Sequence, residues 1–119
     1  MPTIRKRKAK VEKVLKTDVS PFRCSLEVII TSDMVKTGTR LGVEDDDLHG
    51  RMGYVISNEG DCIMVLNKNC LCPGLIAHDS AHVVFAMMRQ ARQSPAKGEE
   101  TFCYILQNVV DFILENYKK

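Results

Sequence analysis

Residues 52–67 read MGYVISNEGDCIMVLN and predict a β-hairpin. Apolar residues, several of them β-branched, fill the segments Met52–Ser57 and Cys62–Asn67, and runs of this kind favour strands. The intervening Asn58-Glu59-Gly60-Asp61 has the composition of a tight connection between antiparallel strands. The hairpin therefore gives the chain two neighbouring strands on which other elements can pack.

The residues before the hairpin predict a third strand and a short helix. From Cys24 to Thr31 the apolar residues alternate, which places every second side chain on one face of a strand. Ser32 is a suitable helix cap, and the segment from Met34 to Leu41 reads as a helix that ends at Gly42.

Two long helices are expected after the hairpin. The pattern becomes helical from Leu75 to about Gln93, breaks at residues 94–98, and becomes helical again from about Glu99 to Tyr117. The predicted fold class is α+β: a small three-stranded sheet with a hairpin, packed on the two C-terminal helices. The chain of 119 residues is the size of one domain, which we assign to residues 21–119.

The first 20 residues predict a flexible basic arm. Residues 1–16 hold seven lysines and arginines against one acid, Glu12, whereas the whole chain carries a net charge of only +2. Val11, Val14 and Leu15 have the spacing of a short amphipathic helix. A solvated arm is the simpler interpretation, and non-specific nucleic-acid contact through residues 1–16 is the alternative.

The composition argues against a secreted or membrane protein. The five cysteines are odd in number and scattered, which does not suggest a disulfide framework and fits a reducing cytoplasm. No apolar run reaches the length of a membrane span, and no apolar stretch follows the basic N-terminus as in a secretory signal. We therefore expect a soluble cytoplasmic protein, of unknown oligomeric state, without membrane contact.

The strongest functional motif is His78-Asp79-Ser80-Ala81-His82, which lies in the first long predicted helix. Residues four apart lie on one face of a helix, so the two imidazoles can converge on one ion. Only three histidines occur in the chain, and two of them have this spacing among apolar neighbours. The motif predicts a metal site, most simply for zinc, and a histidine pair with ordinary hydrogen-bond partners is the alternative.

A third ligand is expected from the start of the last helix, where Glu99 and Glu100 follow a short connection. Two histidines, one glutamate and one water would form the open four-coordinate zinc site that supports hydrolysis.

The segment Pro73–Val84, followed by Glu99–Tyr104, resembles small phage and prophage proteins with a zincin-like metallopeptidase core. In that group a hairpin leads into a helix that bears H-E-x-x-H, and the next helix begins with an acidic residue followed by an aromatic. The resemblance covers about residues 50–117. It implies a compact sheet beside two helices, a peptide or protein substrate, and a location in the cytoplasm of a bacterial host.

Carried over by position, the resemblance implies that His78 and His82 are zinc ligands and that Asp79 is the general base. It implies Glu100 as the third ligand, because Tyr104 then falls one turn later, as in the family pattern. The chain departs from the family at Asp79, where the family has glutamate. Aspartate is one methylene shorter, and a base misplaced by about 1 Å can lose on the order of 10²-fold in rate. A degenerate enzyme, or a non-catalytic binding or inhibitor module with a vestigial metal site, is the alternative reading.

The other polar clusters have simpler explanations. Cys70-Leu71-Cys72 is too closely spaced for a paired zinc knuckle, so these residues are most simply free thiols. The acidic run Glu44–Asp47 lacks the spacing of an EF-hand loop and reads as a solvated turn. His49 is a lone loop histidine.

Overall fold

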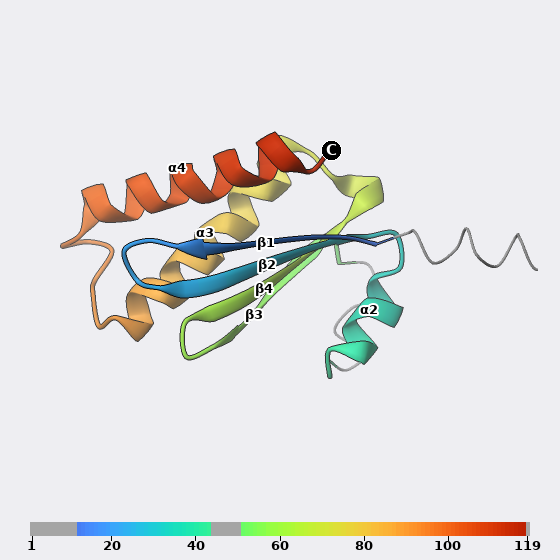
Figure 1. The fold of residues 1–119 in the computed structure, drawn as a ribbon, viewed down its shortest axis with the longest axis horizontal. Helices are drawn as coiled ribbons and strands as arrows, with labels where there is room; N and C mark the ends of the chain where they lie inside the picture. Colours follow the sequence, from blue (N-terminus) through green and yellow to red (C-terminus); the bar gives the residue numbers. More distant parts are fainter. Residues whose placement is uncertain (1–11, 44–50, 119) are drawn as a thin grey trace, which may run out of the picture.

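The computed structural model describes residues 12–43 and 51–118, which form a four-stranded sheet and three α-helices (Figure 1). In chain order the elements are β1 (Lys13–Val19), β2 (Cys24–Thr31), α2 (Met34–Arg40), β3 (Gly53–Asn58), β4 (Asp61–Asn67), the 3₁₀ helix η2 (Lys68–Cys70), α3 (Pro73–Gln90) and α4 (Glu99–Asn116). The predicted α+β class with two long C-terminal helices is confirmed.

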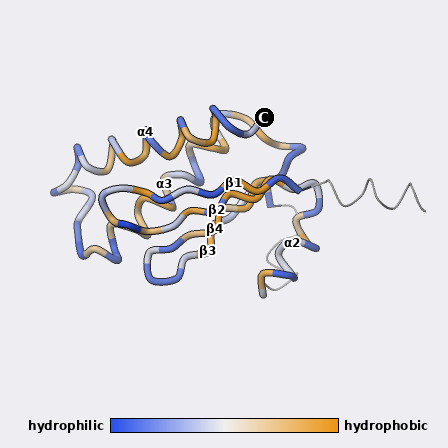
Figure 2. The backbone as a smooth tube through the Cα atoms, viewed as in Figure 1, coloured by the Kyte–Doolittle hydropathy of each residue, from blue (hydrophilic) through white to orange (hydrophobic). Residues whose placement is uncertain are grey.

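The sheet is mixed, with the strand order β1-β2-β4-β3. β1 pairs antiparallel with β2, β2 pairs parallel with β4, and β4 pairs antiparallel with β3. Within the sheet, the central strands β2 and β4 carry most of the apolar residues (Figure 2). Strands of this composition are expected where both faces of the sheet are covered, as they are here. Their parallel pairing requires a connection outside the sheet, and α2 lies in this connection before the chain returns to the sheet as β3.

The predicted strand count of three is wrong, because β1 lies in the segment that we expected to be a flexible arm. β1 pairs with β2 along its full length, from Lys13 opposite Ile30 to Val19 opposite Cys24. Its side chains alternate between exposed and partly buried, so Val14 and Leu15 lie on opposite faces of a strand rather than on one face of a helix. Residues 1–11 of the expected arm lie outside the described residues, as do Glu44–Asp47 and His49.

The predicted hairpin is confirmed, with a tighter turn than expected. Asn58 pairs with Asp61, so only Glu59 and Gly60 form the loop. Both have positive φ, 53° and 91°, as a two-residue hairpin turn of the primed type requires. Gly60 is also needed for space, since a Cβ there would lie 2.7 Å from the Cys24 sulfur.

The main core lies between one face of the sheet and the two long helices. α3 packs against β3, β4 and α4, whereas α4 packs against α3 and β1. The fully buried side chains at this interface include Leu26, Met64, Ile76, Met87 and Ile113. α3 therefore lies over the β3 side of the sheet, with α4 beside it over the β1 side.

The opposite face of the sheet has a smaller core under α2, built from Ile29, Met34, Tyr54 and Val65.

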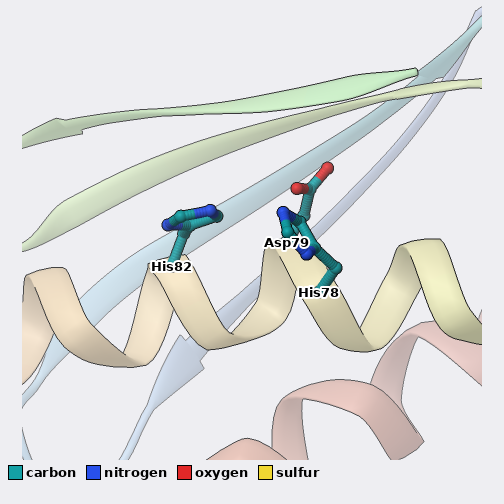
Figure 3. A group of neighbouring side chains, drawn as sticks. All are labelled: His78, Asp79 and His82. Carbon is teal, nitrogen blue, oxygen red and sulfur yellow. The ribbon is translucent and has the colours of Figure 1, made fainter. Parts of the chain in front are cut away.

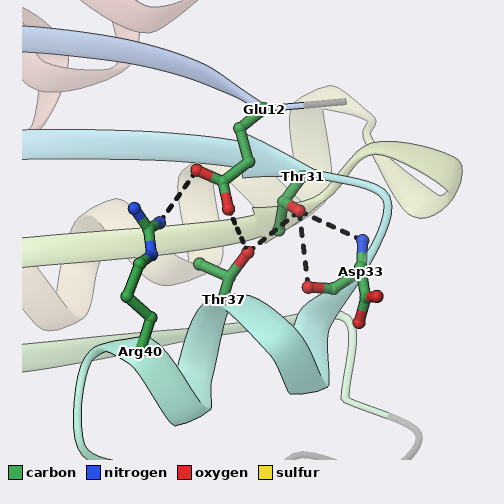
Figure 4. A network of polar contacts seen from close by, with 5 residues as sticks. All are labelled: Glu12, Thr31, Asp33, Thr37 and Arg40. Carbon is green, nitrogen blue, oxygen red and sulfur yellow. Dashed lines mark hydrogen bonds and ion pairs between the residues drawn. The ribbon is translucent and has the colours of Figure 1, made fainter. Parts of the chain in front are cut away.

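A polar network holds α2 to the start of β1 (Figure 4). Arg40 donates to Glu12 across 2.8 Å, and the Thr37 hydroxyl donates to the other Glu12 oxygen across 2.6 Å. The hydroxyls of Thr37 and Thr31 lie 3.0 Å apart. Glu12, the single acid of the basic N-terminal segment, thus has a structural role.

All five cysteines are free thiols. Within residues 12–43 and 51–118, no helix combines the length and apolar character that crossing a bilayer would require.

Cys62 on β4 makes stability depend on pH in the alkaline range. Burial raises the pKa of the Cys62 thiol from 9.0 to about 11. The folded state therefore holds this proton more tightly, and the resulting stability is present below pH 9 and is lost as pH rises toward 11. Between pH 8 and 10.5, the free energy of unfolding should fall by on the order of 2 kcal/mol more for the natural chain than for Cys62→Ala. Urea titrations measure this difference. Cys103→Ala is the control, because Cys103 is exposed; equal pH dependence in all three proteins would contradict the prediction.

Candidate metal site

The site is built on the first half of α3. Pro73 occupies the first turn, where its missing N–H costs no hydrogen bond. The helix buries residues such as Ile76, Val83 and Met87 against the sheet and α4, which fixes its rotation. That rotation leaves His78 and His82 exposed and Asp79 buried.

His78, Asp79 and His82 form a group that can hold a metal ion. One ligand atom from each residue lies within 4.8 Å of the other two. The imidazole rings of His78 and His82 are 5.1 Å apart between centroids, at an interplanar angle of 74°. Figure 3 shows the three side chains on the side of α3 that faces the sheet, with α4 on the other side of the helix. In the part of the chain that the structure describes, no other cluster of histidine, cysteine and acidic residues has this geometry.

Asp79 is the most unusual member of the group. It is only 3% exposed, and its Oδ2 atom has no hydrogen-bond partner among the described residues. Burial raises the pKa of the Asp79 carboxyl, and the neighbouring His78, His82 and Arg51 oppose that rise. A buried carboxylate oxygen without a hydrogen-bond partner is costly, and a cation bound beside it would supply the missing interaction.

The close approach of β3 to α3 explains why Asp79 fits. A Cβ at Gly53 would collide with Oδ2 of Asp79 and would lie 3.1 Å from the Val65 carbonyl oxygen. Position 53 must therefore be glycine for the carboxylate to occupy this place between helix and strand.

A pocket of about 290 Å³ opens beside the three residues. One wall is the α3 face formed by His78, Asp79, His82, Ala86 and Arg89; the other is β3, with Arg51 next to it. The site is therefore open to a small molecule or an extended chain on the side where the histidines are exposed. Gly53, Arg51 and Arg89 were not predicted from the sequence as residues of the site. For Arg89, the helical spacing from His82 could have indicated that both side chains lie on one face of the helix.

The structure does not bring Glu100 to the histidines. Glu100 is exposed in the first turn of α4 and lies outside the group, and Asp79 is the acid that joins the two imidazoles. The start of α4 lies beside the end of α3, since a Cβ at Gly98 would be 3.1 Å from the Met88 side chain. Met88 follows His78 by ten residues, about 15 Å along a helix. Tyr104 is likewise 62% exposed.

Cys70 and Cys72 lie outside the metal-binding group and are free thiols.

Comparisons with models of protein families, with curated proteins and with solved structures give no match for this chain.

Replacing Asp79 with Asn should stabilise the metal-free protein at pH 7. Because the pKa of Asp79 is raised on folding, its contribution to stability is present below its unfolded value of 3.8 and is lost as pH rises. At neutral pH the ionised carboxylate is a net cost. Urea unfolding in the presence of a chelator should give Asp79→Asn about 1–3 kcal/mol more stability than the natural chain, with a smaller gain at pH 4. A less stable variant at pH 7 would show that the carboxylate is well partnered.

Proposed function

We propose that His78 and His82 bind a zinc ion and that the chain is a zincin-like hydrolase acting on peptide bonds. The observation that carries this proposal is the convergence of two imidazoles and one carboxylate in an open pocket. Imidazole is a common zinc ligand, and two imidazoles beside an open pocket leave coordination positions for a water and the substrate, as in catalytic zinc sites. The unpartnered Oδ2 of Asp79 supports the presence of a cation on independent grounds.

The arrangement of the elements supports the zincin-like interpretation. The β3–β4 hairpin leads through η2 into α3, which carries the motif, as the resemblance implies. β3 is an edge strand of the described sheet and forms one wall of the pocket. The backbone groups of an edge strand are free to pair with an extended peptide. A peptide on β3 would pass beside His78 and His82, which favours a peptide over a compact small molecule.

In the proposed peptide hydrolysis, the metal and Asp79 would have separate roles. A zinc ion in this place would polarise the carbonyl of the substrate and acidify a water. Asp79 would accept the proton, and its pKa, raised by burial, is displaced toward the range in which a carboxylate is an effective base. The two histidines hold the metal from the same helix, so the geometry depends on one rigid element.

A second candidate is a non-catalytic module stabilised by metal. The observation that favours it is that an Asp79 carboxylate oxygen lies within 4.8 Å of the histidine nitrogens, so Asp79 belongs to the same group of candidate ligands. In that case Asp79 would bind the metal, and α3 would offer no general base.

Nucleic-acid binding by the basic N-terminal residues stays a separate hypothesis. Two lysines of this basic segment, Lys13 and Lys16, lie in β1.

Zinc binding tests the first half of the proposal. The natural chain should bind one zinc ion per molecule, measured by metal analysis and by calorimetry. His78→Ala should weaken binding by roughly 100-fold or more, since loss of a ligand exceeds the effect of losing its supporting contacts. Glu100→Ala is the matched control and should bind as the natural chain does. Sub-stoichiometric zinc, or equal affinity in His78→Ala, would contradict the site.

Asp79→Asn separates the two candidates. If Asp79 is the base, the variant loses about 10²–10⁴-fold in the rate of peptide hydrolysis, while its zinc affinity falls much less than that of His78→Ala. If Asp79 is a ligand, its zinc affinity falls as far as that of His78→Ala, by roughly 100-fold or more.

Asp79→Glu restores the reach of the family residue and should raise the hydrolysis rate by on the order of 10²-fold. Zinc-loaded natural chain and Asp79→Glu that both fail to cleave a mixed peptide library would contradict the peptidase proposal while leaving the metal site intact.

A further inference from the structure

The pocket extends from the histidines along one face of α3. His78, His82, Ala86 and Arg89 are spaced by four, four and three residues, so they lie in one stripe, and all four line the pocket. Arg89 follows His82 by seven residues, about 10 Å along the helix. The stripe therefore begins at the metal-binding group and ends at a guanidinium group.

The other wall runs beside this stripe from end to end. Gly53, Val55 and Ser57 alternate along β3 and line the pocket. Gly53 lies against Asp79, at the metal end. Ser57 lies near the turn of the hairpin, and a Cβ at Gly60 in that turn would be 3.0 Å from the Gln90 side chain, so Arg89, which precedes Gln90, lies at this end of the strand. The groove thus has the metal group at one end and Arg89 at the other.

The charges in the groove are unequal. Asp79 is the only acid among the lining residues, and it belongs to the metal-binding group. Arg89 is exposed and forms no ion pair within residues 12–43 and 51–118. Arg51 adds positive charge at the metal end. Between the two ends the lining residues are small or apolar, Ala86 and Val55.

We propose that Arg89 forms a subsite for a carboxylate of the bound peptide. This inference rests on the proposed zinc site and names the class of substrate: peptides with an acidic side chain, or a free C-terminus, beyond the bond held at the metal. A guanidinium group and a carboxylate form a bidentate, charge-assisted pair of hydrogen bonds. Helical side chains lean toward the N-terminus, so Arg89 reaches back toward His82. An extended residue spans about 3.3–3.6 Å, which places the carboxylate about two residues from the metal.

The test uses short peptides with an N-terminal hydroxamate, a group that anchors to zinc without being hydrolysed. Three probes share one backbone: the first has Glu two residues from the hydroxamate and a C-terminal amide, and the second has Gln at that position with the amide. The third has Gln with a free C-terminal carboxylate. Calorimetry on the zinc-loaded full chain gives the Kd of each, so binding is measured rather than activity.

The natural chain should bind at least one of the two carboxylate probes about ten-fold or more tightly than the neutral probe, as expected for a charged hydrogen bond. The probe that gains identifies the source of the carboxylate, side chain or C-terminus. Arg89→Gln should lose this gain and still bind the neutral probe normally, which shows that the variant is folded and zinc-loaded. Arg92→Gln removes an exposed arginine outside the groove and should keep the gain.

Two results would overturn the subsite: equal affinity of all three probes for the natural chain, or a carboxylate gain that persists in Arg89→Gln. Failure of the neutral probe to bind is a different result, because that probe depends on zinc alone. It would contradict the zinc site, and the subsite with it.

Discussion

The packing of α3 against β3 and β4 is the contact on which the rest of the molecule depends. The helix buries Val83, Val84 and Met87 completely, which fixes its rotation and its position along the sheet. That placement brings Asp79 against Gly53, where no side chain larger than hydrogen fits. A shift of the helix by one residue would turn the stripe from His78 to Arg89 by about 100° and remove it from the pocket. Fold and site therefore share one interface.

The same interface holds a polar group that folding alone does not explain. Asp79 is buried with an unpartnered oxygen, while the two imidazoles lie beside it at the surface. Natural proteins keep few buried polar atoms without partners, and each one that persists requires an explanation. We propose that a cation completes this group, and that the exposed side of the histidines and the groove toward Arg89 receive the substrate.

Much of this fold could be predicted from the sequence, because its elements have clear periodicity. The hairpin at residues 53–67 and the long helices have apolar patterns that match one period only. β1 was missed because Val14 and Leu15 are too few to distinguish a helix from a strand, and β2 supplies the pairing that decides between them.

The site was predictable only where its residues are neighbours in the sequence. His78 and His82 follow from local helix geometry, and Asp79 from its place between them. The positions of Glu100, Gly53 and Arg89 depend on how separate elements pack: α4 starts beside the far end of α3, and β3 crosses directly over Asp79.

X-ray absorption at the zinc edge of the loaded protein tests the central claim most directly. We expect two imidazoles and oxygen donors at about 2.0–2.1 Å, whereas sulfur ligands at about 2.3 Å, or a shell without imidazole, would contradict it.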